Sequence, residues 1–373
     1  KSTLDVIKRD KRNFDVVLLT ANNNYKRLIQ QAKEFKAKNI IIKNKIFYQE
    51  VKKKLKNSKI KVFTGDISIS KIISGKVDYT MSALVGLAGL QPTIDAIKVS
   101  KNVAIANKET IICGWNLIEK MKKKYQTKII PVDSEHFSIM ELTQNIKDNE
   151  VEEIIITASG GPFLNYANKK LKKVKPKDAI KHPNWTMGKK ISVDSANMMN
   201  KVFEVIEANK LFNFNRFKYK LMIHPQSYVH SIIRFKNGLI KMILYNSDMK
   251  IPISNILYKN KVYMNNISNI DIKILNGLSF ERIDFKKFPS IKLINKCFKL
   301  GHSAPIIINA ANEVLVNLFL EKKISFTDIV ATINRIIKHK DSKKYAKRKS
   351  TSIKDIKIID NWARLKTTDM CVR

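Results

Sequence analysis

The chain has 373 residues, of which 44% are hydrophobic, so it is long enough for two or three domains that each bury a core. Its formal net charge is +39, but the lysines occur throughout the chain and form none of the usual nucleic-acid-binding motifs, so we predict no nucleic-acid partner. The chain also lacks an uninterrupted apolar run of about 18 residues, which argues against a membrane-spanning helix or a membrane partner.

The three cysteines, Cys113, Cys297 and Cys371, are far apart in the sequence and form no C-x-x-C pair. This number and spacing favour neither a disulfide framework nor a structural zinc site. We therefore expect a soluble, intracellular protein in a reducing compartment.

From residue 14 to residue 128, short β-branched runs alternate with amphipathic stretches such as Tyr25–Lys36 and Gln91–Val99, which is the pattern of βαβ units. We predict an α/β fold that begins with a doubly wound, Rossmann-like parallel sheet in a domain spanning residues 1–132. The predicted strands are Asp15–Leu19, Asn39–Ile42, Lys61–Phe63, Tyr79–Ser82, Asn102–Ala106 and Lys128–Pro131.

A dinucleotide-binding sheet normally opens with a strand and a glycine-rich turn, which bring the pyrophosphate to a helix N-terminus. Here the segment from Ser2 to Ile7 already has the pattern of the helix that would follow such a turn. The expectation is a sequence truncated at its N-terminus, without the first strand and the glycine-rich loop.

Residues 133–264 are predicted to form an α+β catalytic domain with a mixed or antiparallel sheet. A less regular linker, 265–288, leads to a small helical C-terminal domain, 289–373, in which the lysine-rich segment 338–354 is predicted to be a solvated loop. The strands expected in the catalytic domain are Glu153–Thr157, Leu221–His224, Ser231–Phe235 and Ile240–Leu244, together with the helix Ala196–Leu211. The helices expected in the C-terminal domain are Ser290–Leu300, Ile308–Glu321, Phe326–Lys338 and Ile353–Leu365.

Carboxylates in two segments suggest a cation site. If the chain stays extended after the last strand of the first domain, Asp133 and Glu135 share a face, and a hard divalent cation would relieve their repulsion. Glu204 could complete an all-oxygen site from a helix on which Asn200 and Lys201 would donate to an anion. The alternatives are a pair of solvated acids at a loop start and a surface ion pair between Lys201 and Glu204.

Three further segments, and Ser195 in the segment that leads to Glu204, could bind a substrate. Residues 157–163, T-A-S-G-G-P-F, leave backbone N–H groups and the Ser159 hydroxyl open to an oxyanion, although the same letters make a plain tight turn. Residues 182–188 place Trp185 and Met187 where an apolar lid would lie, and the alternative for both is core packing. Lys108 follows a predicted strand and could reach a polarised oxygen, or it could simply be solvated. Ser195 is expected near a helix N-terminus, where a strand hands over to the helix.

The segment after the strand Asp15–Leu19 has no acid for a ribose 2′-hydroxyl, whereas Lys26 and Arg27 lie nearby. This arrangement favours NADP over NAD.

Six segments occur in the order and approximate spacing of the 1-deoxy-D-xylulose 5-phosphate reductoisomerase family, which the chain resembles from Ser2 to about Thr367. They are A-N-K-E-T, P-V-D-S-E-H, T-A-S-G-G-P-F, H-P-N-W-T-M-G-K-K-I-S-V-D-S-A-N-M-M-N-K, I-H-P-Q-S-Y-V-H-S and N-A-A-N-E. The resemblance implies an oxidoreductase and isomerase that uses NADPH and Mg²⁺, Mn²⁺ or Co²⁺. It would convert a small sugar phosphate, 1-deoxy-D-xylulose 5-phosphate, to 2-C-methyl-D-erythritol 4-phosphate for isoprenoid biosynthesis. The resemblance also implies a homodimer in a bacterial cytoplasm, with a plastid as the alternative.

Carried over position by position, the resemblance implies metal ligands, substrate contacts, a flap that carries Trp185 and Met187, and a cofactor site. The implied metal ligands are Asp133, Glu135 and Glu204, which with Lys108 form the catalytic set. The implied substrate-binding residues are Lys108, Ser134, Glu135, Ser159, His182, Trp185, Ser195, Asn200, Lys201 and Glu204. The implied NADPH-binding residues are Asn22, Asn23, Asn24, Asn107, Glu109 and Gly188. We interpret His224, His230 and Asn312 as structural support.

The sequence departs from the family pattern at Asn197, Val202 and Phe203, where Thr, Gly and Leu are usual, and at Asn22 and Asn23, where Gly and Lys are usual. Three alternatives therefore stay open. They are a homoserine-type dehydrogenase without a three-carboxylate metal site, a basic scaffold with salt-sensitive nucleic-acid binding, and an inactive truncated copy.

Overall fold

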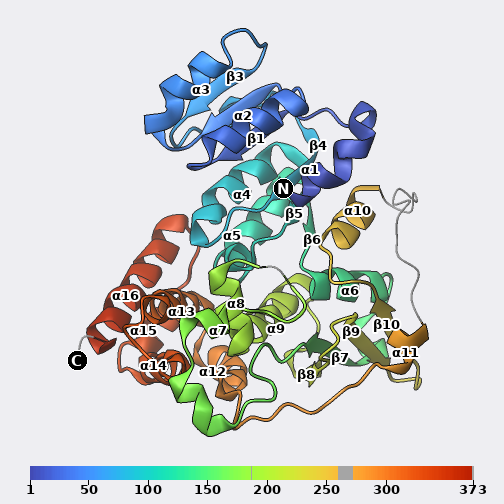
Figure 1. The fold of residues 1–373 in the computed structure, drawn as a ribbon, viewed down its shortest axis with the longest axis vertical. Coiled ribbons are helices and arrows are strands. Elements are labelled where there is room, and N and C mark those ends of the chain that lie inside the picture. Colours follow the sequence, from blue (N-terminus) through green and yellow to red (C-terminus); the bar gives the residue numbers. More distant parts are fainter. Residues whose placement is uncertain (186, 259–271, 372–373) are drawn as a thin grey trace.

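The computed structural model describes residues 1–185, 187–258 and 272–371. The N-terminal strands and helices lie at one end of the molecule, and the C-terminal helices and a third sheet lie side by side at the other (Figure 1). Within the described ranges, no helix is long and apolar enough to cross a membrane.

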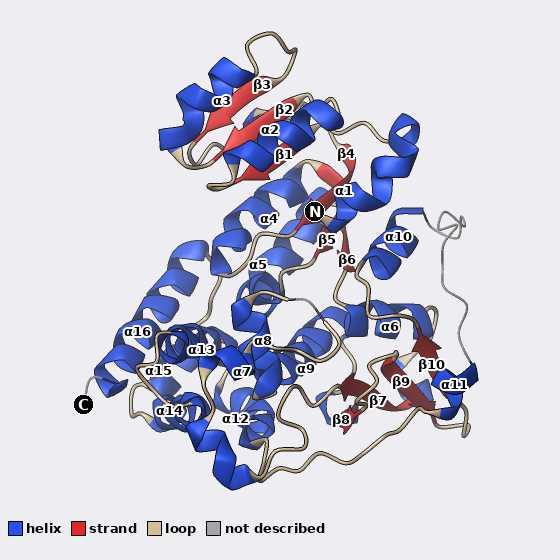
Figure 2. Cartoon of the chain, viewed as in Figure 1, coloured by secondary structure: helices blue, strands red, loops and turns tan. Residues whose placement is uncertain are grey.

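The six strands of the first region are all parallel, which agrees with the predicted Rossmann-like α/β class. They form two three-stranded sheets and not one (Figure 2), because among the described residues no strand from β1 to β3 pairs with a strand from β4 to β6. One sheet contains β1 (Leu18–Ala21), β2 (Asn39–Ile42) and β3 (Lys61–Thr64), and the other contains β4 (Val77–Ser82), β5 (Ser100–Ile105) and β6 (Lys128–Pro131).

Helices pack against both sheets of this region. The predicted helix at the start of the chain is confirmed as α1, and the side chain of Asn24 caps α2 by accepting a hydrogen bond from the Arg27 N–H at 3.2 Å. The side chain of Asn107 caps α5 in the same way, with the Thr110 N–H at 3.2 Å. The helices are α1 (Ser2–Ile7), α2 (Tyr25–Glu34), α3 (Tyr48–Lys54), α4 (Leu90–Lys98) and α5 (Lys108–Tyr125).

The third sheet has the strand order β10-β9-β7-β8 and is mixed, as predicted: β7 and β8 are parallel, whereas β7–β9 and β9–β10 are antiparallel. Helices α6 and α9 cover it, and Ile139 and Val205 pack into a core with Ile154 and Ile233. The elements are α6 (Ser134–Leu142), β7 (Val151–Ala158), α7 (Pro176–Ala179), α8 (Lys189–Ala196), α9 (Met199–Phe212), β8 (Tyr219–Ile223), β9 (Val229–Phe235), β10 (Ile240–Leu244), α10 (Lys250–Tyr258) and α11 (Ile272–Asn276).

The segment that precedes α9 differs from the prediction. A strand was expected to hand over to one helix, but the structure has two helices, α8 and α9, separated at Met198, whose φ of 62° lies in the left-handed region. Asn197 stabilises the break by accepting a hydrogen bond from the Met199 N–H at 2.9 Å. Ser195 therefore lies in the last turn of α8 and not near a helix N-terminus.

The C-terminal region is helical, as predicted, but the expected solvated loop 338–354 contains α15. Ser342 and Ala346 of this helix are buried, and the Ala346 carbonyl accepts a hydrogen bond from the Ser303 N–H at 2.9 Å. The helices are α12 (Leu293–Leu300), α13 (Ala304–Leu320), α14 (Phe326–Lys338), α15 (Ser342–Lys347) and α16 (Ile353–Cys371). One continuous core joins α13, α14 and α16 to α4, α5, α8 and α9, so these helices form a rigid support behind α5 and α9.

Candidate active site

Three acidic side chains converge between α6 and α9. The prediction that the chain stays extended through Glu135 is wrong, because Asp133 is the N-cap of α6 and Glu135 lies in its first turn. The two acids nevertheless face the same point, since one oxygen each of Asp133, Glu135 and Glu204 lie within 4.8 Å of one another. The side chains of Asp133 and Glu135 are 19% and 12% exposed, so this is not a pair of solvated loop acids.

The first turn of α6 is held by the third sheet. The Ser134 carbonyl accepts hydrogen bonds from the Tyr245 hydroxyl at 2.8 Å and from Ser138 Oγ at 2.9 Å, and the Glu135 carbonyl accepts one from Ser231 Oγ at 3.0 Å. The Ser134 hydroxyl donates to Glu135 Oε2 at 2.6 Å. Ser134, which is predicted to bind substrate, therefore also forms a hydrogen bond with one of the three carboxylates.

Two lysines lie among the carboxylates. Lys108 Nζ lies 3.0 Å from Asp133 Oδ2 and 3.3 Å from Glu204 Oε1, and it donates to Asn200 Oδ1 at 2.6 Å. Lys201 Nζ donates to Glu204 Oε2 at 2.7 Å and also to Glu135. Lys201 is only 8% exposed, so the alternative of a surface ion pair is wrong, and a solvated Lys108 is excluded because its side chain is 12% exposed.

Burial and charge shift the pKa values of this cluster in opposite directions. Burial, followed by the charge of Glu135, raises the pKa of Glu204 to about 7. Burial would also raise the pKa of Asp133, but the Lys108 ammonium and further neighbouring groups together outweigh it and lower that pKa. Burial by itself would lower the pKa of Lys201, but the charges of Glu135 and Glu204 raise it. With three carboxylates and two ammonium groups, the ionised cluster carries one excess negative charge, which suits a bound cation.

Ser159 and His182 form a second group. The Asn184 and Trp185 N–H groups donate to His182 Nδ1 at 3.1 and 3.0 Å, so Nδ1 is an acceptor and the ring proton is on Nε2, which lies 3.1 Å from Ser159 Oγ. Burial, assisted by the charge of Lys201, lowers the pKa of His182 to about 4. His182 is therefore a neutral hydrogen-bond donor at neutral pH.

The turn that carries Ser159 packs directly on α8. Gly161 has φ of +65°, and a Cβ there would lie 3.0 Å from the Ser195 carbonyl oxygen and 3.0 Å from Ala196 Cα. A side chain at this position would force the turn away from the half-buried Ser195. Glycine is needed here both for conformation and for close approach.

Trp185 is half-buried, so it is neither a core residue nor fully exposed. Its ring lies 6.1 Å from the His230 ring, which stacks on Tyr245 at 4.2 Å. Tyr245 in turn bonds to the Ser134 carbonyl, so the segment expected to act as a lid is linked through His230 to a side chain that supports the carboxylate cluster.

The residues predicted to bind NADPH lie in two places. Asn23 accepts a hydrogen bond from Asn44 Nδ2 at 2.9 Å beside the cap residue Asn24, in the loop after β1 that also holds Asn22. By contrast, Asn107 and Glu109 flank Lys108 near the carboxylates, where Glu109 pairs with Lys190 at 3.0 Å. Gly188 is the N-cap of α8, and a Cβ there would contact nothing within 4 Å. Among the described residues, no hydrogen bond joins the loop after β1 to Asn107, Glu109 or Gly188.

Sequence reasoning missed several residues of this region. His136 and Glu207 adjoin the cluster, and with Asp133 they form a second group whose ligand atoms lie within 4.8 Å. Lys190 bridges Glu109 and Asp194 at 3.0 Å each. Spacing could have indicated Glu207, which is one helical turn after Glu204, whereas the contacts of Lys190 with Glu109 join distant segments.

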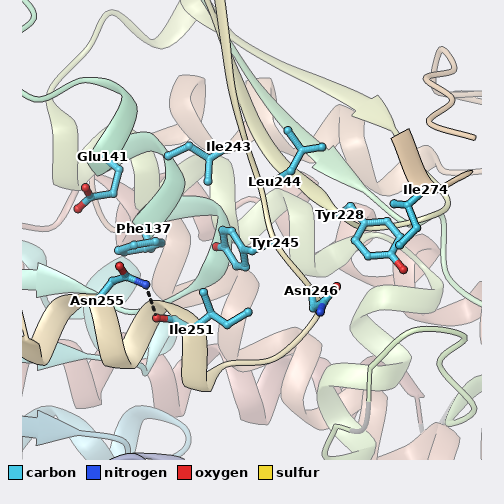
Figure 3. Close-up of a pocket in the computed structure, with 10 residues that line it drawn as sticks. All are labelled: Phe137, Glu141, Tyr228, Ile243, Leu244, Tyr245, Asn246, Ile251, Asn255 and Ile274. Carbon is cyan, nitrogen blue, oxygen red and sulfur yellow. Dashed lines mark hydrogen bonds between the residues drawn. The ribbon is translucent and has the colours of Figure 1, made fainter. Parts of the chain in front are cut away.

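A separate cavity of about 330 Å³ lies beside α6 and β10 (Figure 3). Tyr245 and Phe137 line it, but Glu141 is the only acid among the described residues that line it, and none of the predicted site residues is among them. We therefore place the candidate site at the carboxylates and not in this cavity.

Comparison with known proteins identifies the family of this chain. The chain matches the family models described as 1-deoxy-D-xylulose 5-phosphate reductoisomerase over residues 1–114, its C-terminal domain over residues 129–212, and the DXP reductoisomerase C-terminal domain over residues 244–366. A reductoisomerase of this name from Pelagibacter ubique is 48% identical over 373 residues, which cover 100% of this chain and 96% of the relative. One from Zymomonas mobilis is 37% identical, with 98% of this chain and 92% of the relative covered.

Solved structures agree. The Zymomonas mobilis reductoisomerase in complex with NADPH has a TM-score of 0.91 and 35% identity, covering 99% of this chain and 95% of that chain. A DOX-P reductoisomerase in complex with NADPH, fosmidomycin and magnesium has a TM-score of 0.92 and 31% identity, with the same coverage. The chain therefore belongs to the 1-deoxy-D-xylulose 5-phosphate reductoisomerase family.

Proposed function

We propose that this chain catalyses the NADPH- and divalent-metal-dependent conversion of 1-deoxy-D-xylulose 5-phosphate to 2-C-methyl-D-erythritol 4-phosphate, a step in isoprenoid precursor biosynthesis. The observation that carries the proposal is the convergence of Asp133, Glu135 and Glu204, whose oxygens lie within 4.8 Å of one another. A homoserine-type dehydrogenase would have no need of this arrangement.

The donor set fits Mg²⁺ or Mn²⁺, and Co²⁺ is a further candidate. All three ligand groups are carboxylates, which hard divalent cations prefer. They are fixed from both sides, with α6 held by Tyr245 and Ser231 and with Glu204 on the buried face of α9. A bound cation would polarise the carbonyl of the substrate, and NADPH would supply the hydride.

The lysines and neighbouring donors would bind and orient the sugar phosphate. Lys108, Asn200 and Lys201 present N–H donors around the carboxylates, where the ketone and hydroxyl oxygens would lie. His182 would donate from Nε2 to a phosphate oxygen without a change of protonation, because its pKa is about 4. Ser159 and Ser195 lie on the turn and the helix that meet at Gly161, so both hydroxyls can serve the same anion.

NADPH would bind along the ends of the parallel strands, where ligands of doubly wound sheets bind. Asn22, Asn23 and Asn24 follow β1, and the exposed Lys26 and Arg27 near them suit a 2′-phosphate. Asn107, Glu109 and Gly188 lie near Lys108 or at the start of α8, on the side of the nicotinamide. Trp185 would close over the bound ligands and exclude water.

NADPH oxidation with 1-deoxy-D-xylulose 5-phosphate and Mg²⁺ tests the proposal. We expect turnover that a chelator abolishes and that excess Mg²⁺ restores. Glu204→Gln keeps the size of the side chain but loses a ligand, so we expect roughly a 100-fold or greater loss, beyond the usual effect of outer residues. Glu152→Gln, on the exposed face of β7, is the matched control. Metal-independent turnover, or equal activity of Glu204→Gln and the wild type, would contradict the proposal.

We also propose that the chain forms a homodimer through β10. This strand pairs only with β9 among the described residues, so its other edge is open. Leu239 before the strand and Ile240 and Met242 on it are 56%, 59% and 42% exposed, which is unusual for an uncovered edge. Sedimentation of the wild type and of Ile240→Lys tests this surface, and we expect the variant to be monomeric.

A bacterial cytoplasm is the proposed location. The relatives with 48% and 37% identity come from bacteria, and Cys113, Cys297 and Cys371 are all free thiols, which suits a reducing compartment. Fractionation of cells that express the chain would test this location.

A further inference from the structure

His136 directly links the two helices that carry the carboxylates. It follows Glu135 on α6, is fully buried, and its Nε2 lies 2.9 Å from the backbone carbonyl oxygen of Glu204 on α9. A carbonyl oxygen can only accept, so Nε2 must carry the proton and donate it. The backbone of Glu204 is thus hydrogen-bonded to His136, the residue that follows Glu135.

The other side of the same ring faces Glu207. His136 Nδ1 lies 3.6 Å from Glu207 Oε2, and neither atom has a hydrogen-bond partner among the described residues. Glu207 is 1% exposed and lies one turn after Glu204, so α9 contacts both ring nitrogens. Phe212 of the same helix stacks at 6.3 Å from the ring. The imidazole therefore has little freedom to rotate.

We infer that Glu207, acting through the ring of His136, positions Glu204 against Asp133 and Glu135 and thereby sets the affinity of the site for a divalent cation. The inference rests on the proposed function, which places the cation at these three carboxylates. Both residues are positioning residues, because the cation ligands are Asp133, Glu135 and Glu204. Outer residues of this kind commonly change metal affinity by about 10- to 100-fold, since ligand distances must be held within a few tenths of an ångström.

Mn²⁺ titration followed by electron paramagnetic resonance measures both affinity and stoichiometry without turnover. His136→Leu removes the donor, and we expect the dissociation constant for Mn²⁺ to rise about 10- to 100-fold. His136→Gln retains an amide that can donate to the Glu204 carbonyl, so we expect most of the affinity to return. At saturating Mn²⁺, the KM of His136→Leu for the sugar phosphate should stay close to that of the wild type, because the ring is fully buried.

His224→Leu is the matched control for general damage. His224 is also buried and bonded at Nδ1 to a backbone carbonyl, that of Ser279 at 2.9 Å, but away from the carboxylates. We expect it to lower thermal stability without changing Mn²⁺ affinity. Equal loss of affinity in both leucine variants, or no loss in His136→Leu, would overturn the inference, as would a His136→Gln variant that binds no better than His136→Leu.

The role of Glu207 has its own test. If Glu207 acts through His136, the double variant His136→Leu/Glu207→Met should bind Mn²⁺ no more weakly than His136→Leu alone. If the two residues act independently, the losses of binding free energy from the two substitutions should add. Two Mn²⁺ ions per wild-type chain and one in His136→Leu would show that the ring is a ligand, and the positioning role would be wrong. Unchanged Mn²⁺ binding by Glu204→Gln would instead refute the cation site of the proposed function, so the two failures can be told apart.

Discussion

The Lys201 ammonium lies 2.7 Å from Glu204 Oε2 and also bonds to Glu135, so one buried cation joins carboxylates from α9 and α6. A divalent ion held by the same two acids would lie within a few ångströms of this ammonium. At 4 Å and an effective dielectric constant of 20, two unit charges interact by about 4 kcal/mol. Lys201 therefore opposes the cation electrostatically while it offers a donor to the anionic substrate.

Lys201→Met should separate these two effects. We expect Mn²⁺ to bind about tenfold more tightly or better, because a repelling charge is lost, and kcat/KM for the sugar phosphate to fall about 10- to 100-fold, because a charged hydrogen bond is worth about 1.5–3 kcal/mol. Titration with Mn²⁺ and initial rates at saturating metal measure the two quantities. Lys220→Met, on the exposed face of β8, should change neither. Weaker Mn²⁺ binding by Lys201→Met would show that the ammonium supports the cation site.

Gly161 provides a test of the turn that carries Ser159. Gly161→Ala puts a Cβ 3.0 Å from Ser195 O at a positive φ, so we expect a loss of about 1–3 kcal/mol in the free energy of unfolding. Gly188→Ala is the control, because a Cβ there has no neighbour within 4 Å and should change this free energy little. Urea denaturation measures both. If the two variants are equally stable, the turn does not depend on close approach to α8.

Local pattern was sufficient for most of the strands. Asn39–Ile42 and Lys128–Pro131 are observed as predicted, because short, largely apolar runs are typical of buried parallel strands. The same reasoning failed in the segment of Ser195, where a strand was expected to hand over to a helix but α8 forms. Ser192 and Val193 are both buried there. Where a segment is buried on all sides, the spacing of apolar and polar residues no longer distinguishes a strand from a helix.

The candidate site was predictable only in part. The pairing of Asp133 with Glu135 follows from their spacing, although the assumed extended backbone was wrong. Their meeting with Glu204 was expected as a possible completion of the site and from the family resemblance, because spacing alone does not fix contacts between distant segments. The contact of His136 with Glu207 was missed for the same reason, since it depends on how α6 packs on α9, although the spacing from Glu204 could have indicated Glu207.

Acid should destabilise the protein partly through His230. Burial lowers the pKa of this residue to about 4 in the folded state, against an ordinary value of 6.5. The unfolded chain therefore takes up a proton below about pH 6.5 while the folded protein does not, so stability is full above that pH and falls toward pH 4. The expected loss from this group between about pH 7.5 and pH 5 is about 2 kcal/mol. His230→Gln should show a correspondingly smaller difference between unfolding free energies at the two pH values, and an unchanged difference would contradict the shift.

Lys190 should be essential to the junction between α5 and α8. Its ammonium lies 3.0 Å from both Glu109 and Asp194, which are 5% and 2% exposed, and Asp194 also accepts from Asn312 of α13 at 2.7 Å. Lys190→Met leaves two buried carboxylates without their cation, so we expect a loss of about 3–5 kcal/mol in the free energy of unfolding. Because the remaining charges repel, Lys190→Met/Asp194→Asn should recover part of that loss. Lys189→Met, at the neighbouring exposed position, is the control. A double variant less stable than Lys190→Met would show that Asp194 is held by Asn312 alone and that the lysine does not balance its charge.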